Sequence, residues 1–180
     1  IRSLAARYYT DRQVFEVENA GLLAKTWQFG CHASELTETG DYATFEIAGE
    51  SLFAIRGRDD KIRVFYNVCQ HRAHQLVSGT GTTRVVVCPY HAWTYELTGE
   101  LRAGPNIYAV EGFDKSGICL TEVRAEEFVG FVFVNLDPDA APMEEWFPNA
   151  RAELEEWVPN WVDLKPLEWV DIPENCNWKV

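Results

Sequence analysis

Two short segments of this 180-residue chain each hold one cysteine and one histidine at a spacing that suits metal binding. The first segment pairs Cys69 with His71, and the second, after sixteen intervening residues, pairs Cys88 with His91. Thiolate and imidazole are the soft donors with which proteins bind zinc and iron–sulfur clusters. The four side chains therefore predict either a zinc site or an iron–sulfur cluster in which two histidines replace two cysteines.

The distribution of the donors suits a two-iron cluster, because each segment can give one ligand to each iron. Cys69 and Cys88 would then hold one iron, and His71 and His91 the other. The charges of two ferric ions, two sulfides and two thiolates cancel, so neutral imidazoles leave the oxidised centre uncharged. Reduction is then easier than in an all-cysteine cluster, with midpoint potentials of roughly −150 to +300 mV.

The spacing Cys-x-His, then Cys-x-x-His, resembles the signature of Rieske [2Fe-2S] domains. Within that group, Cys-Gln-His-Arg from Cys69 and Cys-Pro-Tyr-His-Ala-Trp from Cys88 resemble the α-subunits of Rieske non-haem iron oxygenases, the ring-hydroxylating oxygenase family. Respiratory Rieske proteins carry an extra cysteine in each loop and a serine after the second histidine, where this chain has His74, Tyr90 and Trp93. Without that disulfide and hydroxyl, we expect a potential in the lower half of the range, and below about +150 mV.

This resemblance implies a mainly β fold, with a Rieske [2Fe-2S] domain of antiparallel sheets, an N-terminal helix and a short helical C-terminal extension. It also implies an oxidoreductase. The remaining cysteines have no paired spacing that suggests disulfides, which fits a reducing cytoplasm. An NAD(P)H-linked reductase or a ferredoxin would supply electrons through the exposed edge of His71 and His91. A mononuclear Fe(II), in the catalytic domain of the same or a neighbouring subunit of a homotrimer, would activate O2 for hydroxylation or N-demethylation.

The substrate expectation comes from flanking segments such as Ala-Arg-Tyr-Tyr-Thr-Asp near the start and Gly-Phe-Val-Phe-Val-Asn-Leu-Asp-Pro later. These look most like the choline monooxygenase and betaine demethylase branch, which acts on quaternary ammonium compounds. The alternative is the α-subunit of an aromatic-ring hydroxylating dioxygenase. Two further alternatives are a stand-alone Rieske ferredoxin, which would end near residue 137, and a structural zinc-binding module, which would be colourless.

Several other residues near the motif are open to more than one interpretation. Trp93 and Pro105 are candidates for shielding the cluster, Pro105 as part of a third, proline-containing loop of Rieske domains. A core tryptophan and an ordinary turn are the alternatives. We expect His32 and His74 not to bind metal. The other three cysteines, for which we expect burial as small apolar residues without disulfides, are Cys31, Cys119 and Cys176.

Composition excludes some classes of function. The formal net charge of −12 argues against a nucleic-acid surface, and the longest apolar run, residues 128–136, is too short to span a bilayer. Residues 137–175 contain eleven acids and two bases. This stretch is interpreted either as a solvated helical face or as a docking surface for a basic partner.

The elements that must position the motif follow from sequence periodicity. Thr10 and Gln13 fit a capping box, so we expect a helix from residue 10 to about residue 25 that buries Phe15, Leu22, Leu23 and Trp27. From residue 26, short alternating segments predict antiparallel strands. Hairpins that turn at 58–61 and 98–99 would present the cluster loops, with the expected strands at 43–47, 51–57, 62–67, 84–87, 93–97, 100–102, 118–123 and 128–135.

Three regions are predicted: a helical arm over residues 1–26, the Rieske domain over 27–137, and a tryptophan-rich connection with helices at 143–147 and 149–157 over 138–180. Five of the seven tryptophans lie between Trp146 and Trp178. The final Asn-Trp-Lys resembles the start of an oxygenase catalytic domain. A mononuclear iron needs two histidines and a carboxylate, and His32 and His74 do not supply them. No catalytic residue is therefore predicted in this chain, and those ligands are expected beyond Val180.

Overall fold

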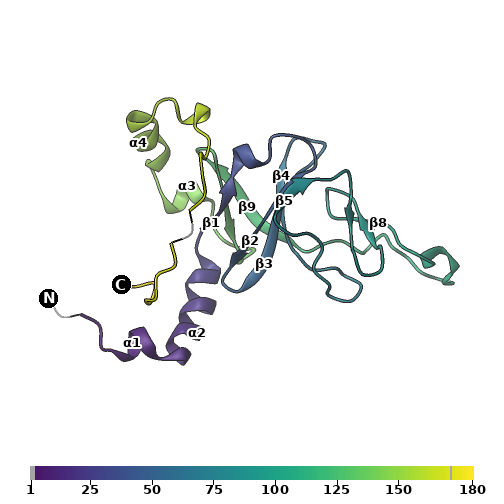
Figure 1. The fold of residues 1–180 in the computed structure, drawn as a ribbon, viewed down its shortest axis with the longest axis horizontal. Helices are drawn as coiled ribbons and strands as arrows, with labels where there is room; N and C mark the ends of the chain where they lie inside the picture. Colours follow the sequence, from purple (N-terminus) through teal and green to yellow (C-terminus); the bar gives the residue numbers. More distant parts are fainter. Residues whose placement is uncertain (1–2, 171) are drawn as a thin grey trace.

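The computed structural model describes residues 3–170 and 172–180 of the chain. Its largest unit is a strongly curled seven-stranded antiparallel sheet in the order β1-β10-β9-β4-β3-β2-β5, and a three-stranded sheet in the order β6-β7-β8 lies beside it (Figure 1). The mainly β fold expected from the sequence is confirmed. The strands of the large sheet are β1 (Gln28–His32), β2 (Asp41–Ile47), β3 (Glu50–Arg56), β4 (Ile62–Tyr66), β5 (Thr80–Thr82), β9 (Glu122–Phe128) and β10 (Phe131–Asn135).

The centre of the large sheet is buried on both faces because its strands alternate two sets of apolar side chains. In β3, Leu52 and Ala54 pack into one core cluster, while Phe53 and Ile55 point to the other face. That second cluster also contains Phe65 of β4. The second face is therefore the one that can support the small sheet.

The small sheet consists of β6 (Val86–Val87), β7 (Thr94–Tyr95) and β8 (Leu101–Ala103). Its buried side chains Tyr95 and Leu101, and Leu97 between β7 and β8, join the second core cluster of the large sheet. The predicted turn at Thr98–Gly99 is present, with Gly99 at φ 97°. A Cβ there would lie 2.8 Å from the Phe65 ring, so glycine fits both the backbone angle and the close sheet packing.

The expected N-terminal helix is shorter than the sequence predicts, and its cap is a different residue. The Asp11 side chain accepts the Gln13 N–H at 2.8 Å, whereas the Thr10 hydroxyl donates to a carbonyl of the preceding turn. The helical segments are α1 (Arg7–Thr10), α2 (Arg12–Gly21) and the 3-10 turn η1 (Leu23–Lys25). Asp11 is the better cap because a carboxylate near the start of a helix also interacts favourably with the helix dipole.

The buried side predicted for this helix is also largely wrong: Trp27 is buried and Leu23 is half-buried. Phe15 and Leu22 are 45% and 42% exposed, and α2 has no buried residue. Figure 1 shows the reason: α2 stands beside the edge of the large sheet and does not lie across its face. Helical periodicity reports an apolar side, but it does not specify what that side packs against.

The last hairpin of the large sheet differs from the prediction because its turn is apolar. The sequence predicts a strand over residues 128–135, whereas Val129 and Gly130 form a two-residue turn at φ 45° and 83°. The preceding strand β9 begins at Glu122, four residues later than predicted. A β-branched residue is rare at positive φ, so the turn has no signature in the sequence. Strand β5 was not expected either.

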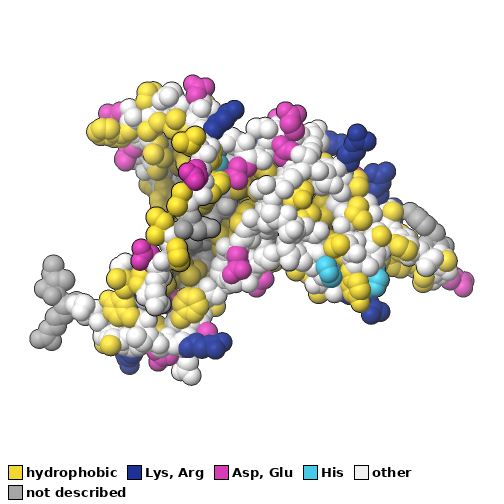
Figure 2. Space-filling view, in the orientation of Figure 1, with side chains coloured by type: hydrophobic (Ala, Val, Ile, Leu, Met, Phe, Trp, Pro, Cys, Tyr) yellow, Lys and Arg dark blue, Asp and Glu magenta, His cyan; other side chains and the backbone are white. Residues whose placement is uncertain are grey.

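The C-terminal region begins with the two predicted short helices, α3 (Met143–Trp146) and α4 (Ala150–Trp157), followed by the 3-10 turn η4 (Trp161–Asp163). Met143 is buried in a small separate core with Trp27 and Phe128. Acidic side chains surround α4, at the end of the molecule opposite β8 (Figure 2). Among the described residues, no helix has the length and apolar character needed to cross a membrane.

Candidate metal centre

The first cluster loop follows β4 and is closed by a pair of backbone hydrogen bonds. The Cys69 N–H donates to the His74 carbonyl and the Ala73 N–H donates to the Cys69 carbonyl, both at 2.9 Å. At the base of the loop, the buried Asn67 side chain accepts the N–H groups of Leu76 and Val77. These bonds hold the loop as a rigid turn.

The second cluster loop repeats this backbone geometry at the tip of the β6–β7 hairpin. The Cys88 N–H donates to the Trp93 carbonyl at 2.8 Å, and the Ala92 N–H donates to the Cys88 carbonyl at 2.9 Å. Ala73 and Ala92 occupy the same place in their loops and have φ of 53° and 54°. Two sequence segments with different histidine spacings therefore fold into two copies of one turn.

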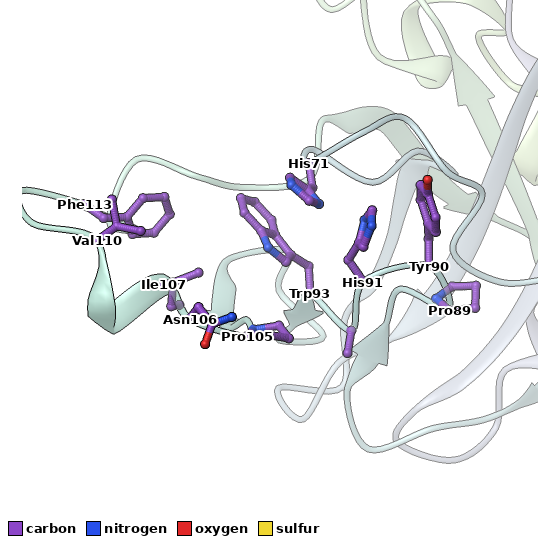
Figure 3. A pocket seen from close by; sticks show the side chains of 11 residues that line it. His71, Pro89, Tyr90, His91, Trp93, Pro105, Asn106, Ile107, Val110 and Phe113 are labelled. Carbon is purple, nitrogen blue, oxygen red and sulfur yellow. The ribbon is translucent and has the colours of Figure 1, made fainter.

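The structure places the two predicted thiol ligands in one core cluster and the two predicted imidazole ligands next to each other, and the two pairs differ in exposure. Cys69 and Cys88 are each 2% exposed and lie in the core between the sheets, whereas His71 is exposed and His91 half-buried. The two imidazole ring centroids are 4.8 Å apart, and Figure 3 shows the rings side by side. The thiols thus form an inner side of the site and the histidines an outer side.

The donors fit an iron–sulfur cluster on two observations. Neither cysteine forms a disulfide, so two buried thiols are available as ligands. The Nδ1 atom of His91 is buried and has no hydrogen-bond partner, which suits a nitrogen that binds a metal. Burial, and then the nearby charge of His71, lower the pKa of His91 and favour the neutral ring that metal binding requires. In the described part of the chain no three His, Cys, Asp or Glu side chains converge on one metal position; a two-iron cluster takes two protein donors per iron.

Tyr95 is a site residue that the sequence reasoning missed. Its fully buried hydroxyl lies 3.2 Å from Cys69 Sγ and accepts the Gln70 N–H at 3.0 Å. Burial, followed by the contact with Cys69, raises the pKa of Tyr95. When Cys69 is a thiolate, the tyrosine hydroxyl is the donor. The sequence contained one signal for this role, since Tyr95 lies in a predicted strand beside the second motif. A tyrosine buried there needs a hydrogen-bond partner for its hydroxyl.

The two candidate shielding residues lie on the outer side of the site. The Trp93 ring stacks on His71, with centroids 4.8 Å apart and an angle of 11° between the rings. Trp93 also packs on the backbone of Gly104, where a Cβ would lie 2.8 Å from the indole. Pro105 lines a hollow of about 690 Å³ next to both histidines (Figure 3). Their shielding role stays a prediction.

His32 and the three remaining cysteines differ in burial. His32 is buried at the end of β1, where its Nδ1 accepts the Ser34 N–H. Cys31 is buried, and burial raises the pKa of its thiol to about 12. The expectation of burial is wrong for Cys119 and Cys176, which are exposed. Cys119 forms an isolated β-bridge with Glu100 outside the strands, and Cys176 lies in an irregular segment.

Comparison with known proteins gives a consistent result. Residues 26–114 match the family model described as "Rieske [2Fe-2S] domain". The chain is 44% identical over 178 residues to the carnitine monooxygenase oxygenase subunit of Escherichia coli (strain K12), covering 98% of this chain and 48% of that protein. It is 37% identical over 177 residues to the 2-aminobenzenesulfonate 2,3-dioxygenase subunit alpha of Alcaligenes sp, covering 96% and 45%.

A solved structure supports the same relationship. The quaternary ammonium Rieske monooxygenase CntA, in complex with gamma-butyrobetaine, superimposes with a TM-score of 0.86 at 41% identity, covering 91% of this chain and 47% of that one. The chain therefore spans about half the length of the curated relatives it matches.

Proposed function

Because the chain belongs to the Rieske [2Fe-2S] family through residues 26–114, we propose that it is the electron-transfer part of an oxygenase. The proposed ligands are Cys69 and Cys88 for one iron, and His71 and His91 for the other. When bound, the cluster takes up and releases one electron at a time. The observation that carries this proposal is the pair of matching loops with two buried free thiols and the unpartnered Nδ1 of His91.

In this function the protein side chains hold the redox centre and control access to it. The core between the sheets keeps water away from the Cys69 and Cys88 sulfurs. The Tyr95 hydroxyl offers a hydrogen bond to the Cys69 sulfur, and such bonds stabilise negative charge there. His71 and His91 face outward, so their ring N–H groups can hydrogen-bond to a partner protein.

The partners and the rest of the enzyme belong to this proposal. Residues 27–137 form the proposed Rieske domain, residues 1–26 an arm and residues 138–180 a connection to a catalytic domain that holds mononuclear Fe(II). The proposed electron donor is an NAD(P)H-linked reductase or a ferredoxin. The acceptor domain belongs to the same or a neighbouring subunit of a homotrimer. The proposed location is the cytoplasm, where thiols stay reduced.

Metal analysis tests the electron-transfer proposal directly. Anaerobically purified chain is expected to contain two irons and two acid-labile sulfides, and to give a rhombic EPR signal after reduction with dithionite. Stoichiometric zinc without sulfide would support the structural zinc module. A stand-alone ferredoxin would give the same spectra, but the match to oxygenase subunits covers 98% of this chain, including the region after residue 137.

The proposed substrate is a small quaternary ammonium compound, which the similarity to the carnitine and gamma-butyrobetaine proteins supports. A second candidate, an aromatic-ring dioxygenase α-subunit, is favoured by the 37% identity to the 2-aminobenzenesulfonate enzyme. The test is O2 and NADH consumption by the whole protein with its reductase. Carnitine and gamma-butyrobetaine are compared with 2-aminobenzenesulfonate, and substrate-dependent consumption with product formation identifies the correct class.

A further inference from the structure

The two cluster loops contact each other differently on the inner and outer sides of the site. On the inner side, the Tyr95 hydroxyl next to the second loop contacts Cys69 and Gln70 of the first. On the outer side, in addition to the contacts of His71 with His91 and Trp93, one contact is made by two rings outside the proposed ligand set. His74 of the first loop packs against Tyr90 of the second, with ring centroids 5.5 Å apart and tilted by 37°.

Tyr90 also covers one of the proposed iron ligands. Its ring centroid lies 3.7 Å from that of His91, and the two rings are tilted by 33°. Figure 3 shows Tyr90 beside His91 on the side away from Trp93. Trp93 stacks on His71, so the two imidazoles lie between two larger rings. Tyr90 is itself 55% exposed, and its outer surface faces solvent.

His74 is held in an orientation that suits this contact. Its Nδ1 lies 2.6 Å from the carbonyl oxygen of Gln75, and its backbone carbonyl accepts the Cys69 N–H that closes the first loop. Both the ring and the backbone of His74 are therefore fixed relative to Cys69. A ring fixed in this way loses little conformational entropy on packing against Tyr90.

We propose that His74 and Tyr90 form a non-covalent clasp that holds the two cluster loops together on the solvent side and limits water access to His91. The inference rests on the proposed function, since it assumes that the loops bind a cluster. The two residues are positioning residues: they act through the loops and through His91. Aromatic contacts of this kind stabilise beyond their buried area, and the rings also displace water from the imidazole edge.

Release of iron to a chelator tests the clasp. Holo-protein is mixed with excess EDTA, and the loss of visible absorption is followed in wild type, Tyr90→Ala, His74→Ala and the double variant. Each single variant is expected to lose its cluster roughly 2- to 10-fold faster, the range that corresponds to the coupling of an aromatic pair. The double variant should be no faster than the faster single variant, because one contact is removed only once.

The conservative variants and the control separate the clasp from general effects. Tyr90→Phe and His74→Phe keep both rings and should lose iron at the wild-type rate. Trp157→Ala removes a ring that is 82% exposed at the far end of the chain and should also behave as wild type. The midpoint potential is a second measurement. Tyr90→Ala should admit water, and water stabilises the added negative charge of the reduced centre. The potential should therefore become more positive.

The possible outcomes distinguish the two proposals. Wild-type chain without acid-labile sulfide overturns the proposed function. If the chain holds its cluster and both alanine variants release iron at the wild-type rate, the clasp alone is wrong. Strictly multiplicative effects in the double variant overturn it as well. Should Tyr90→Ala fail to load, the comparison of His74→Ala with His74→Phe decides, because His74 is exposed and outside the proposed ligand set.

Discussion

Single residues tune the midpoint potential of the cluster, and Tyr95 has the largest expected effect. Its hydroxyl proton is directed to Cys69 because its oxygen already accepts the Gln70 N–H. Reduction places additional negative charge on the cluster and its sulfur ligands, so this hydrogen bond should be stronger in the reduced state. This chain lacks the serine that respiratory Rieske proteins carry after the second histidine, but the buried Tyr95 hydroxyl contacts the Cys69 sulfur.

Tyr95→Phe should therefore make the midpoint potential more negative. If this hydrogen bond is stronger in the reduced state by about 0.5–1.5 kcal/mol, its loss shifts the potential of a one-electron couple by roughly 20–65 mV. Protein-film voltammetry measures the shift directly. Tyr66→Phe is the control. Tyr66 packs against the first core cluster of the large sheet, whereas Cys69 and Cys88 lie in the second, so this variant should leave the potential unchanged. An unchanged or higher potential in Tyr95→Phe would contradict the assigned role.

The histidine assignment gives a second prediction at this scale. Replacing His71 or His91 by Ala removes one of two nitrogen donors to one iron, so the EPR signal of the reduced centre should be abolished. The far-UV CD spectrum of the β fold should survive, because both side chains lie on the outer side of the site. His74→Gln is the matched control from the same loop and should keep the signal. An unchanged signal in His71→Ala or His91→Ala would refute the ligand set.

At the scale of elements, the two loops share a backbone position that is unfavourable for the residue it holds. Ala73 and Ala92 have positive φ, a conformation that is about 1–2 kcal/mol unfavourable for residues other than glycine. Ala92→Gly is therefore expected to raise the free energy of unfolding by roughly 0.5–1 kcal/mol, after the greater flexibility of unfolded glycine is subtracted. Urea unfolding followed by CD measures the change.

The control for this prediction is the same substitution where φ is ordinary. Ala103 lies in β8, and Ala103→Gly should lower the free energy of unfolding by about 0.5–1 kcal/mol. Opposite signs at the two sites would identify the backbone angle as the cause. If Ala92→Gly destabilises as much as Ala103→Gly, the left-handed position is not under strain.

The edge of the large sheet gives a pH-dependent prediction. Asp41 of β2 accepts hydrogen bonds from the Thr82 hydroxyl of β5 and from the Glu38 N–H. The bond from Thr82 is the main reason that the pKa of Asp41 lies below its usual value. A lowered folded-state pKa contributes stability that is complete above the unfolded value, near 3.9, and is lost as pH falls through the folded value.

Thr82→Val should consequently lower the free energy of unfolding at pH 7 by less than about 1 kcal/mol, since Thr82 is exposed and Asp41 is only half-buried. The difference from wild type should shrink as pH falls below about 4. Urea titrations at pH 7 and pH 3 measure it. Thr80→Val, on the same strand, is the control and should show a difference that does not change with pH. A constant difference for Thr82→Val would exclude the linkage to Asp41.

The elements also show what the sequence can and cannot specify. Hairpins with polar or glycine turns, at residues 58–61 and 98–99, were predictable because the turn residues differ from the strands. The Val129–Gly130 turn was not, since its residues continue the apolar run. The proposed ligands could be named from their spacing, and that assignment stays a prediction. The Tyr95 contact, the αL alanines and the His74–Tyr90 contact depend on how the two sheets bring distant segments together.

At the scale of the whole molecule, the net charge of −12 acts on the redox centre. Reduction adds a negative charge to an already negative protein, so the overall field should lower the midpoint potential and keep it below about +150 mV. Salt screens that repulsion. The potential is therefore expected to become more positive as ionic strength rises from about 0.02 M to 0.5 M. Voltammetry over that range is the measurement, and a negative shift would contradict the expectation.

Both sulfurs are buried and the histidines face outward, so in the described part of the chain the imidazole side is the side of the redox centre that another protein can approach. Under the proposed function, a protein that delivers electrons and a protein that receives them would bind at this same side in turn. Donor and acceptor proteins would then compete for one binding face. A large excess of the electron donor would slow onward electron transfer, because it would occupy that face.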